Sequence, residues 1–278
     1  MVDERSVFDI GLHDGNDTAY YLDRGHRVVA VDANPDVVTA AQTRFAKEVR
    51  DGRLTLVNIG VGDREGTLPF YVNPNDDKLS SFDAALAGRP LTACREILVQ
   101  VVPLQTLFER YGIPYYLKVD IEGNDECCAR ALLGASELPR FVSFELFLVD
   151  ENAILEPLRA VGYRRYKLIY GPTLSQAEPI FAHELGARLL RKLSRRVPLF
   201  GRAMRALPEP WRPAKDEFSR FRESLSYPFG EGCTGPFGDD THGPWHSFEH
   251  VRSHAARLRK KAARDPIANL WYDVHATL

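Results

Sequence analysis

Short apolar segments alternate with stretches of helical spacing along the first part of the chain. The apolar runs predict strands at residues 7–10, 27–31, 54–59, 115–119 and 141–144. Apolar residues that recur every three or four positions predict helices at residues 18–24, 36–49, 103–111, 125–135 and 151–161. Gly162 ends the last of these helices, and residues 163–170 predict one more strand. This alternation predicts an α/β fold with a parallel sheet between helices.

The composition changes after Gly171. Lysine and arginine outnumber the acids between residues 186 and 222, and the apolar residues of 185–207 recur at helical spacing, which predicts a basic amphipathic helix. A loop rich in glycine and proline follows, then a second basic helix near residues 247–264. The alternating segment 269–278 predicts a final strand.

This order of elements predicts a single domain over residues 1–278 with a long insertion before its last strand. If the strand at 163–170 is parallel to the others and the final strand returns antiparallel beside it, their connection lies at the carboxyl ends of the parallel strands. Open α/β sheets bind their ligands at those ends. We therefore expect a core of residues 1–170 and 266–278, and a lid of residues 171–265 over the ligand site.

Composition narrows the class of protein. Hydrophobic residues make up 44% of the 278 positions, and the net charge of −2 gives no general attraction to nucleic acid. No apolar run is long enough to span a bilayer, and too little precedes the first strand for a signal peptide, so we expect a cytoplasmic protein. The four cysteines lack CxxC spacing, and we expect reduced thiols. Peripheral contact with anionic lipid through helix 185–207 stays an alternative to simple packing over the sheet.

The sequence DIGLHDG, residues 9–15, lies between the first strand and the first helix. Nucleotide-binding folds hold a ligand against the backbone at this position. The loop lacks the lysine and hydroxyl residue of a P-loop, and His13 stands where a dinucleotide-binding GxGxxG loop has glycine. The acidic side chains of Asp14 and Asp17 also disfavour a pyrophosphate. The loop therefore predicts a close approach of the backbone to a ligand without a pyrophosphate.

Polar residues also end the second and third strands. Asp32 ends the second strand, where a carboxylate accepts hydrogen bonds from both hydroxyls of a ribose. Asn58 ends the third strand, with Gly60 and Asp63 close behind, and these groups are placed to reach an adenine ring. A ligand that carries adenosine but no pyrophosphate fits S-adenosylmethionine, whose ammonium group suits Asp9 or another acid of the glycine loop.

Five segments in this order resemble the FkbM family of S-adenosylmethionine-dependent O-methyltransferases: FDIGLHDGNDT, VVAVDANP, VNIGVGDREGTLPFYV, VPLQTLFERYGIPYYLKVDIEGNDECCARALLGA and FVSFEL. LKVDIEG, residues 117–123, is the most specific match, and the resemblance covers about residues 7–170. It implies a Rossmann-like class I methyltransferase sheet of seven strands, in the order 3-2-1-4-5-7-6 with the last strand antiparallel. The chain departs from the family at Asp32, where glutamate is usual, and at GLHDG, where GANxG is common.

The loop, the strand ends and the resemblance together define the expected cofactor site. The residues that we expect to hold S-adenosylmethionine are Asp9, Gly11, His13, Asp14, Gly15, Thr18, Asp32, Ala33, Asn34, Asn58, Gly60, Asp63 and Lys118.

Methyl transfer to a hydroxyl needs a group that removes the proton of the acceptor. Asp120 and Glu122, just after the fourth strand, are our candidates for this base or for an anchor of the acceptor hydroxyl. Two alternatives stay open. One is that Glu122 and Lys118 are buried structural partners that order the turn. The other, which we do not favour, is that these acids hold magnesium together with Asp125 and Glu126.

Further candidates lie at the fifth strand and in the expected lid. Glu145 ends the fifth strand and is a candidate contact of the acceptor. His242 and His246 are candidate bases, because histidine titrates near neutral pH. Trp245, Trp271 and Tyr272 can stack on a sugar ring or pack the lid onto the core.

The sequence therefore predicts an S-adenosylmethionine-dependent O-methyltransferase that acts on a hydroxyl of a sugar or of a glycosylated small molecule. The alternatives are an N-methyltransferase or carboxyl methyltransferase on the same scaffold, and a cofactor-binding, membrane-associated protein without turnover.

Overall fold

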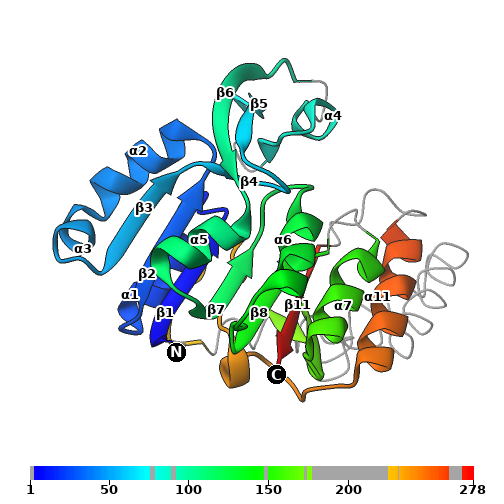
Figure 1. Ribbon diagram of the computed structural model, residues 1–278. Helices are drawn as coiled ribbons and strands as arrows, with labels where there is room; N and C mark the ends of the chain where they lie inside the picture. Colours follow the sequence, from blue (N-terminus) through cyan, green and yellow to red (C-terminus); the bar gives the residue numbers. More distant parts are fainter. Residues whose placement is uncertain are drawn as a thin grey trace, which may run out of the picture.

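The computed structural model describes residues 3–75, 79–88, 92–146, 150–171, 174–176, 225–230, 232–262 and 271–278. Within these residues, eight strands form a main sheet in the order β10-β9-β11-β8-β7-β1-β2-β3 (Figure 1). The strands are β1 (Asp3–Ile10), β2 (Arg27–Asp32), β3 (Leu54–Asn58), β7 (Pro114–Val119), β8 (Phe141–Glu145), β9 (Arg165–Tyr170), β10 (Ser175–Gln176) and β11 (Tyr272–Thr277). Neighbours from β3 to β8 pair in parallel, whereas β11 is antiparallel to both β8 and β9.

The α/β architecture and the antiparallel final strand agree with the sequence prediction, but the sheet differs in detail. It has eight strands and not seven, because the short strand β10 adds to the edge beside β9. The expected helix 36–49 is interrupted at Phe45, which has φ −110° and ψ 27° and lies between α2 and α3. Phe45 is buried, and its ring lies under Gly15, so packing beneath the glycine loop accompanies the break in the helix.

Helices cover both faces of the main sheet. They are α1 (Asn16–Asp23), α2 (Pro35–Arg44), α3 (Ala46–Arg50), α5 (Leu104–Tyr111), α6 (Asp125–Ala131), α7 (Glu151–Val161) and α11 (Phe248–Ala262). The short helix α4 (Ala84–Ala87) instead contacts β5 (Gly66–Val72), and two 3-10 turns are η2 (Leu132–Gly134) and η4 (Gly238–Asp240). Alternate residues of β1 enter two different cores. Phe8 and Ile10 belong to the core that α5, α6, α7 and α11 cover, on the face turned to the viewer in Figure 1, and Val7 belongs to the core with α1 and α2. No helix in the described ranges is long and apolar enough to cross a membrane.

On the face of α1, a row of buried polar side chains crosses five strands in register. Its members are Asp9, Lys118, Ser143, His275 and Lys167. The described part of the expected lid covers this face of the sheet. The ring of Phe237 stacks on Tyr116 at 4.1 Å, and Lys167 Nζ donates a hydrogen bond of 2.8 Å to the carbonyl of Thr241. The basic helix expected at 185–207 lies outside the described residues, and the assignment of residues 171–265 as a lid stays a prediction.

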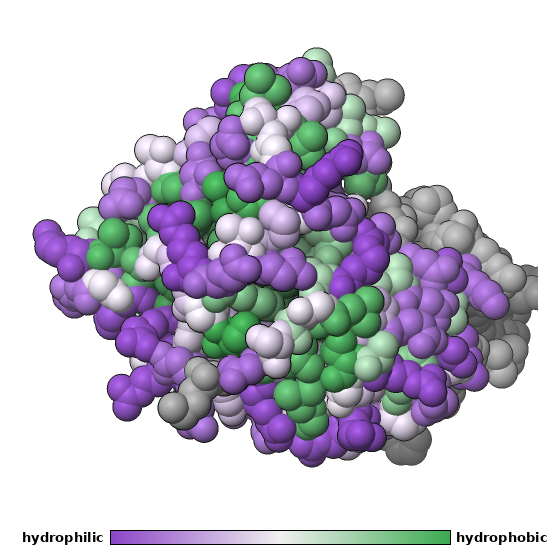
Figure 2. Space-filling model, viewed as in Figure 1, coloured by the Kyte–Doolittle hydropathy of each residue, from purple (hydrophilic) through white to green (hydrophobic). Residues whose placement is uncertain are grey.

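A second, smaller sheet was not predicted. Strands β4 (Gly60–Val61), β5 (Gly66–Val72) and β6 (Arg95–Val102) form it in the order β4-β6-β5, and it projects beyond the end of the main sheet (Figure 1). The apolar pattern of these strands is weak, because Leu68 and Leu98 are exposed and Pro69 interrupts β5. Proline is tolerated there because β5 is an edge strand. Figure 2 accordingly shows hydrophilic and hydrophobic side chains mixed over this part of the surface.

The packing of Phe237 makes the C-terminal segment part of the folded core. Phe237 also contacts Tyr21, Tyr115 and Phe141, so we expect Phe237→Ala to lower the free energy of unfolding by roughly 3 kcal/mol, as for other core aromatic truncations. Urea denaturation measures this loss. Leu98→Ala, at a side chain that is 73% exposed, is the control and should change stability by less than about 0.5 kcal/mol. If both substitutions lowered the free energy of unfolding equally, Phe237 would not be part of the folded core.

Candidate active site

A cavity of about 460 Å³ lies at the carboxyl ends of β1, β2, β7 and β8, beside the small sheet. Many of the predicted site residues line it: Gly11, His13, Asp14, Asp32, Ala33, Asn34, Gly60, Lys118, Asp120 and Glu122. The lining also includes Glu145 and Trp271, and residues that were not assigned to the site from the sequence, such as Asp17, Phe82 and Gly232.

The glycine loop begins with a close backbone contact. Gly11 has φ +92°, and a Cβ atom there would lie 1.7 Å from the carbonyl oxygen of Asp120. Its N–H donates to the carbonyl of Val31, so this one residue contacts both strands that flank β1. Gly15, at the other end of the loop, has φ +74° and lies on the ring of Phe45. Gly11 lines the cavity but Gly15 does not, so Gly15 shapes the loop from outside the cavity.

Asp32 joins two loops at the end of β2. Its Oδ2 accepts a hydrogen bond of 3.0 Å from the N–H of His13, and its Oδ1 accepts one of 2.8 Å from the N–H of Asn34. Burial raises the pKa of Asp32, and these two bonds oppose the increase. An ionised carboxylate has about four acceptor positions, so both oxygens can still accept from ribose hydroxyls. The Asn58 amide donates to the carbonyls of Asp32 and Ala33, and Asn58 therefore supports the backbone and does not line the cavity.

Three predicted cofactor residues form a buried network at the floor of the cavity. Lys118 Nζ lies 2.8 Å from Asp9 Oδ1 and donates a second bond of 2.8 Å to the carbonyl of Gly11. The other oxygen of Asp9 accepts a bond of 2.6 Å from the Thr18 hydroxyl. Lys118 reaches the cavity, whereas Asp9 and Thr18 lie behind it. Their position supports a role in holding Lys118 and the loop.

Asp17 connects the cavity to the C-terminal segment. Its carboxylate accepts bonds of 3.0 Å from the N–H groups of Thr234 and Gly235, and it lies 3.9 Å from Lys118 Nζ. Gly232, just before these donors, lines the cavity as Asp17 does. The sequence contained one signal for Asp17, an acid in the first turn of the helix after the glycine loop, but its partners lie more than two hundred positions away.

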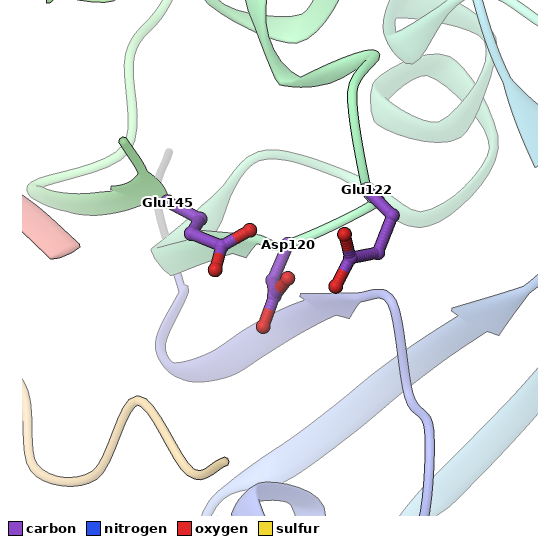
Figure 3. Close-up of side chains that lie close together, drawn as sticks. All are labelled: Asp120, Glu122 and Glu145. Atoms are coloured by element: carbon purple, nitrogen blue, oxygen red, sulfur yellow. The ribbon is translucent and has the colours of Figure 1, made fainter. Parts of the chain in front are cut away.

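Three carboxylates converge on the wall of the cavity (Figure 3). Asp120 follows β7, Glu122 lies in the turn behind it with φ +48°, and Glu145 ends β8. One carboxylate oxygen from each lies within 4.8 Å of the others. Burial, followed by the charge of Asp120, raises the pKa of Glu145 well above its usual value. The Ser81 hydroxyl donates to the carbonyl of Glu122 and so attaches the small sheet to this turn.

The remaining predicted residues lie outside the cavity. Asp63 forms an exposed ion pair with Arg130 at 2.9 Å, so it is not placed to contact adenine. His242 Nδ1 accepts a bond from the N–H of Gln176, and the ring of His246 stacks on His250 at 4.2 Å. Neither histidine lines the cavity, and we no longer assign a catalytic role to them. Loop composition had suggested both histidines, but it does not determine the direction in which a loop folds.

Of the two candidate tryptophans, only Trp271 lines the cavity. Trp245 donates a bond of 2.7 Å to Asp239 and packs over Lys167, so it serves packing of the C-terminal segment. Trp271 lines the cavity and remains a candidate for contact with the acceptor.

The geometry first defines a class of protein. A glycine turn after β1 and a carboxylate at the end of β2, in a parallel sheet with its cavity at the carboxyl ends, are typical of nucleotide-binding α/β enzymes. The sequence profile of the methyltransferase FkbM domain matches residues 9–164. The chain therefore belongs to the FkbM family of S-adenosylmethionine-dependent methyltransferases, which confirms the family indicated by the sequence motifs.

Solved structures of other methyltransferases are distant. Precorrin-6y C5,15-methyltransferase from Geobacter metallireducens shares 14% identity over 62% of this chain and 71% of that chain, with a TM-score of 0.34. Phosphoethanolamine N-methyltransferase 2 from Haemonchus contortus, in complex with S-adenosyl-L-methionine, shares 11% identity over 100% of this chain and 49% of that chain, with a TM-score of 0.38. These scores are too low to support an argument about substrate. No curated protein matches the chain.

The environment of Asp17 predicts a pH-dependent stability. Burial raises the pKa of Asp17 from 3.8 to about 6. A carboxyl group with a raised pKa in the folded chain contributes stability below about pH 4, and this contribution is lost as the pH rises through about 6. We expect Asp17→Asn, which does not titrate, to lose less stability than the wild type between about pH 4 and pH 7. Urea denaturation across this range measures the difference, and parallel profiles would contradict it.

Proposed function

We propose that this protein is an O-methyltransferase that transfers the methyl group of S-adenosylmethionine to a hydroxyl of a sugar or of a glycosylated small molecule. One observation carries the proposal: the carboxylates of Asp120, Glu122 and Glu145 share a cavity with Asp32, the acid at the end of β2. The cavity thus has a carboxylate suited to a ribose and a group of acids suited to an acceptor.

The lining residues fit an adenosine group. Asp32 keeps acceptor positions for ribose hydroxyls, and the apolar side chains of Ile59, Val61, Phe70 and Phe82 supply a surface for adenine. Gly60 is needed beside them, because a Cβ atom there would lie 2.4 Å from the ring of Phe82. When bound, S-adenosylmethionine supplies an activated methyl group on a sulfonium. The protein has to orient the acceptor and accept its proton.

The acids on the wall favour a hydroxyl acceptor. Burial and the neighbouring charge of Asp120 raise the pKa of Glu145, and a carboxylate with a raised pKa is a stronger base. Asp120 and Glu122 lie beside it, so neighbouring hydroxyls of one sugar ring can donate to different carboxylates. A carboxylate acceptor would instead bring a further negative charge to a group of acids that already repel one another. This contrast supports O-methylation of a neutral polyol over carboxyl methylation.

Asp32 should determine cofactor affinity. Loss of the ribose hydrogen bonds in Asp32→Ala should weaken the binding of S-adenosylhomocysteine by about 1–3 kcal/mol, which isothermal titration measures. Asp63→Ala is the matched control, because Asp63 lies outside the cavity. This variant should bind S-adenosylhomocysteine as tightly as the wild type does. A loss of affinity in Asp63→Ala without one in Asp32→Ala would reverse the assignment.

The acceptor class is tested by a panel of hydroxyl, amine and carboxylate compounds with labelled S-adenosylmethionine. We expect methylated sugars or glycosides, and Asp120→Asn should lower kcat by about 10²–10⁴-fold if Asp120 takes part in proton removal. Its affinity for S-adenosylhomocysteine should persist, which shows that the cavity is intact. If only amines or only carboxylates were methylated, the proposal of a hydroxyl acceptor would be wrong. Binding of S-adenosylhomocysteine without transfer to any compound would favour a protein without turnover.

A further inference from the structure

The three acids of the cavity wall have the spacing of cation ligands. Figure 3 shows the side chains of Asp120, Glu122 and Glu145 directed toward a common region, and one oxygen of each lies within 4.8 Å of the others. Oxygen ligands on opposite sides of one cation lie up to about 4.2 Å apart around Mg²⁺ and about 5 Å apart around Ca²⁺. The carboxylates therefore need only small movements to bind one such ion.

A fourth acid gives independent support. Asp273 in β11 pairs directly with Glu145 in β8, so both side chains leave the same face of the sheet, with Cβ atoms about 5 Å apart. Asp273 is 2% exposed, and its Oδ2 has no hydrogen-bond partner among the described residues, although Thr234 bonds to the side chain. A buried carboxylate oxygen without a partner is costly unless a proton, a water molecule or a cation satisfies it.

The ammonium group of Lys118 acts on both the floor and the wall of the cavity. Lys118 Nζ bonds to Asp9 and to the carbonyl of Gly11 at 2.8 Å each, lies 3.9 Å from Asp17, and also interacts electrostatically with Asp120. Asp125 is also buried, and it is a further acid that interacts electrostatically with Asp120. The acids of the wall are thus crowded, and a divalent cation would relieve their repulsion.

We propose that Asp120, Glu122 and Glu145 bind one oxygen-preferring divalent cation, such as Mg²⁺, and that Asp273 supports this site from the neighbouring strand, beside Glu145. Asp273 is a positioning residue in this arrangement, because it acts through Glu145 or through a water molecule of the ion. Nothing in the family assignment requires the ion, and its binding can be tested without any acceptor.

The role of the ion rests on the function proposed above. An acceptor hydroxyl that replaces a water molecule on the cation becomes more acidic. Its O–H bond then breaks with the proton passing to a wall carboxylate, and its oxygen forms the new bond to the methyl carbon. The carbon–sulfur bond breaks with its electron pair remaining on sulfur. Two adjacent hydroxyls of a sugar can occupy two positions of the ion, which would select a diol and orient one of its oxygens.

Mn²⁺ binding to the purified, EDTA-treated chain tests the site, with free Mn²⁺ followed by electron paramagnetic resonance in the absence of cofactor and acceptor. We expect one bound Mn²⁺ per chain, displaced by Mg²⁺. Glu145→Gln and Asp120→Asn should abolish this binding, and Asp273→Asn should weaken it at least about tenfold. Glu109→Gln, at an exposed acid of α5, is the matched control and should bind as the wild type does.

Titration with S-adenosylhomocysteine on the same samples shows that each variant is folded and separates the two proposals. A wild-type chain that binds no Mn²⁺ overturns the ion site, as does unchanged Mn²⁺ binding in both Glu145→Gln and Asp120→Asn. If Glu145→Gln fails to fold, Asp120→Asn and Asp273→Asn decide the question. Saturable Mn²⁺ binding that is lost in these variants supports the site even if no acceptor is methylated, which would contradict only the proposed function.

Discussion

The ion pair between Lys118 and Asp9 is the contact on which the site depends. Both groups are almost fully buried, and removal of either partner would leave an uncompensated charge at a cost of about 3–5 kcal/mol. The pair joins β7 to β1, and its further bonds reach the carbonyl of Gly11 and the hydroxyl of Thr18. One ammonium group therefore fixes the relative positions of two strands, the glycine loop and the first helix, and with them the floor of the cavity.

The wall of the cavity combines parts that are distant in sequence. The acids come from the ends of β7 and β8, the small sheet attaches to their turn through Ser81, and the C-terminal segment reaches it through Asp17. The family match ends at residue 164, yet Gly232 and Trp271 line the same cavity. The matched segment thus carries the cofactor motifs, and residues outside the match complete the lining of the cavity.

Local patterns predicted much of this site, because strand, turn and helix follow one another within a few residues. Gly11 and Asp32 were identified this way, and both line the cavity. The pairing of Lys118 with Asp9 was not, since it follows from strand register across the sheet. The same limit explains Asp63, which lies close to the end of a strand as Asp32 does but pairs with Arg130 on an exposed surface. The small sheet was missed because exposed leucines and Pro69 break the alternation of apolar and polar residues that indicates a strand.

The position of β11 has a consequence for how the chain reaches its folded state. β8 and β9 are consecutive strands of the main sheet in sequence, but β11 lies between them and bonds to both. Until Tyr272–Thr277 arrives, each of these strands presents an open edge whose backbone groups can pair with another chain. Contacts between residues so far apart form slowly. The partly folded protein is therefore exposed to intermolecular strand pairing, and closure of this gap is the step at which folding competes with aggregation.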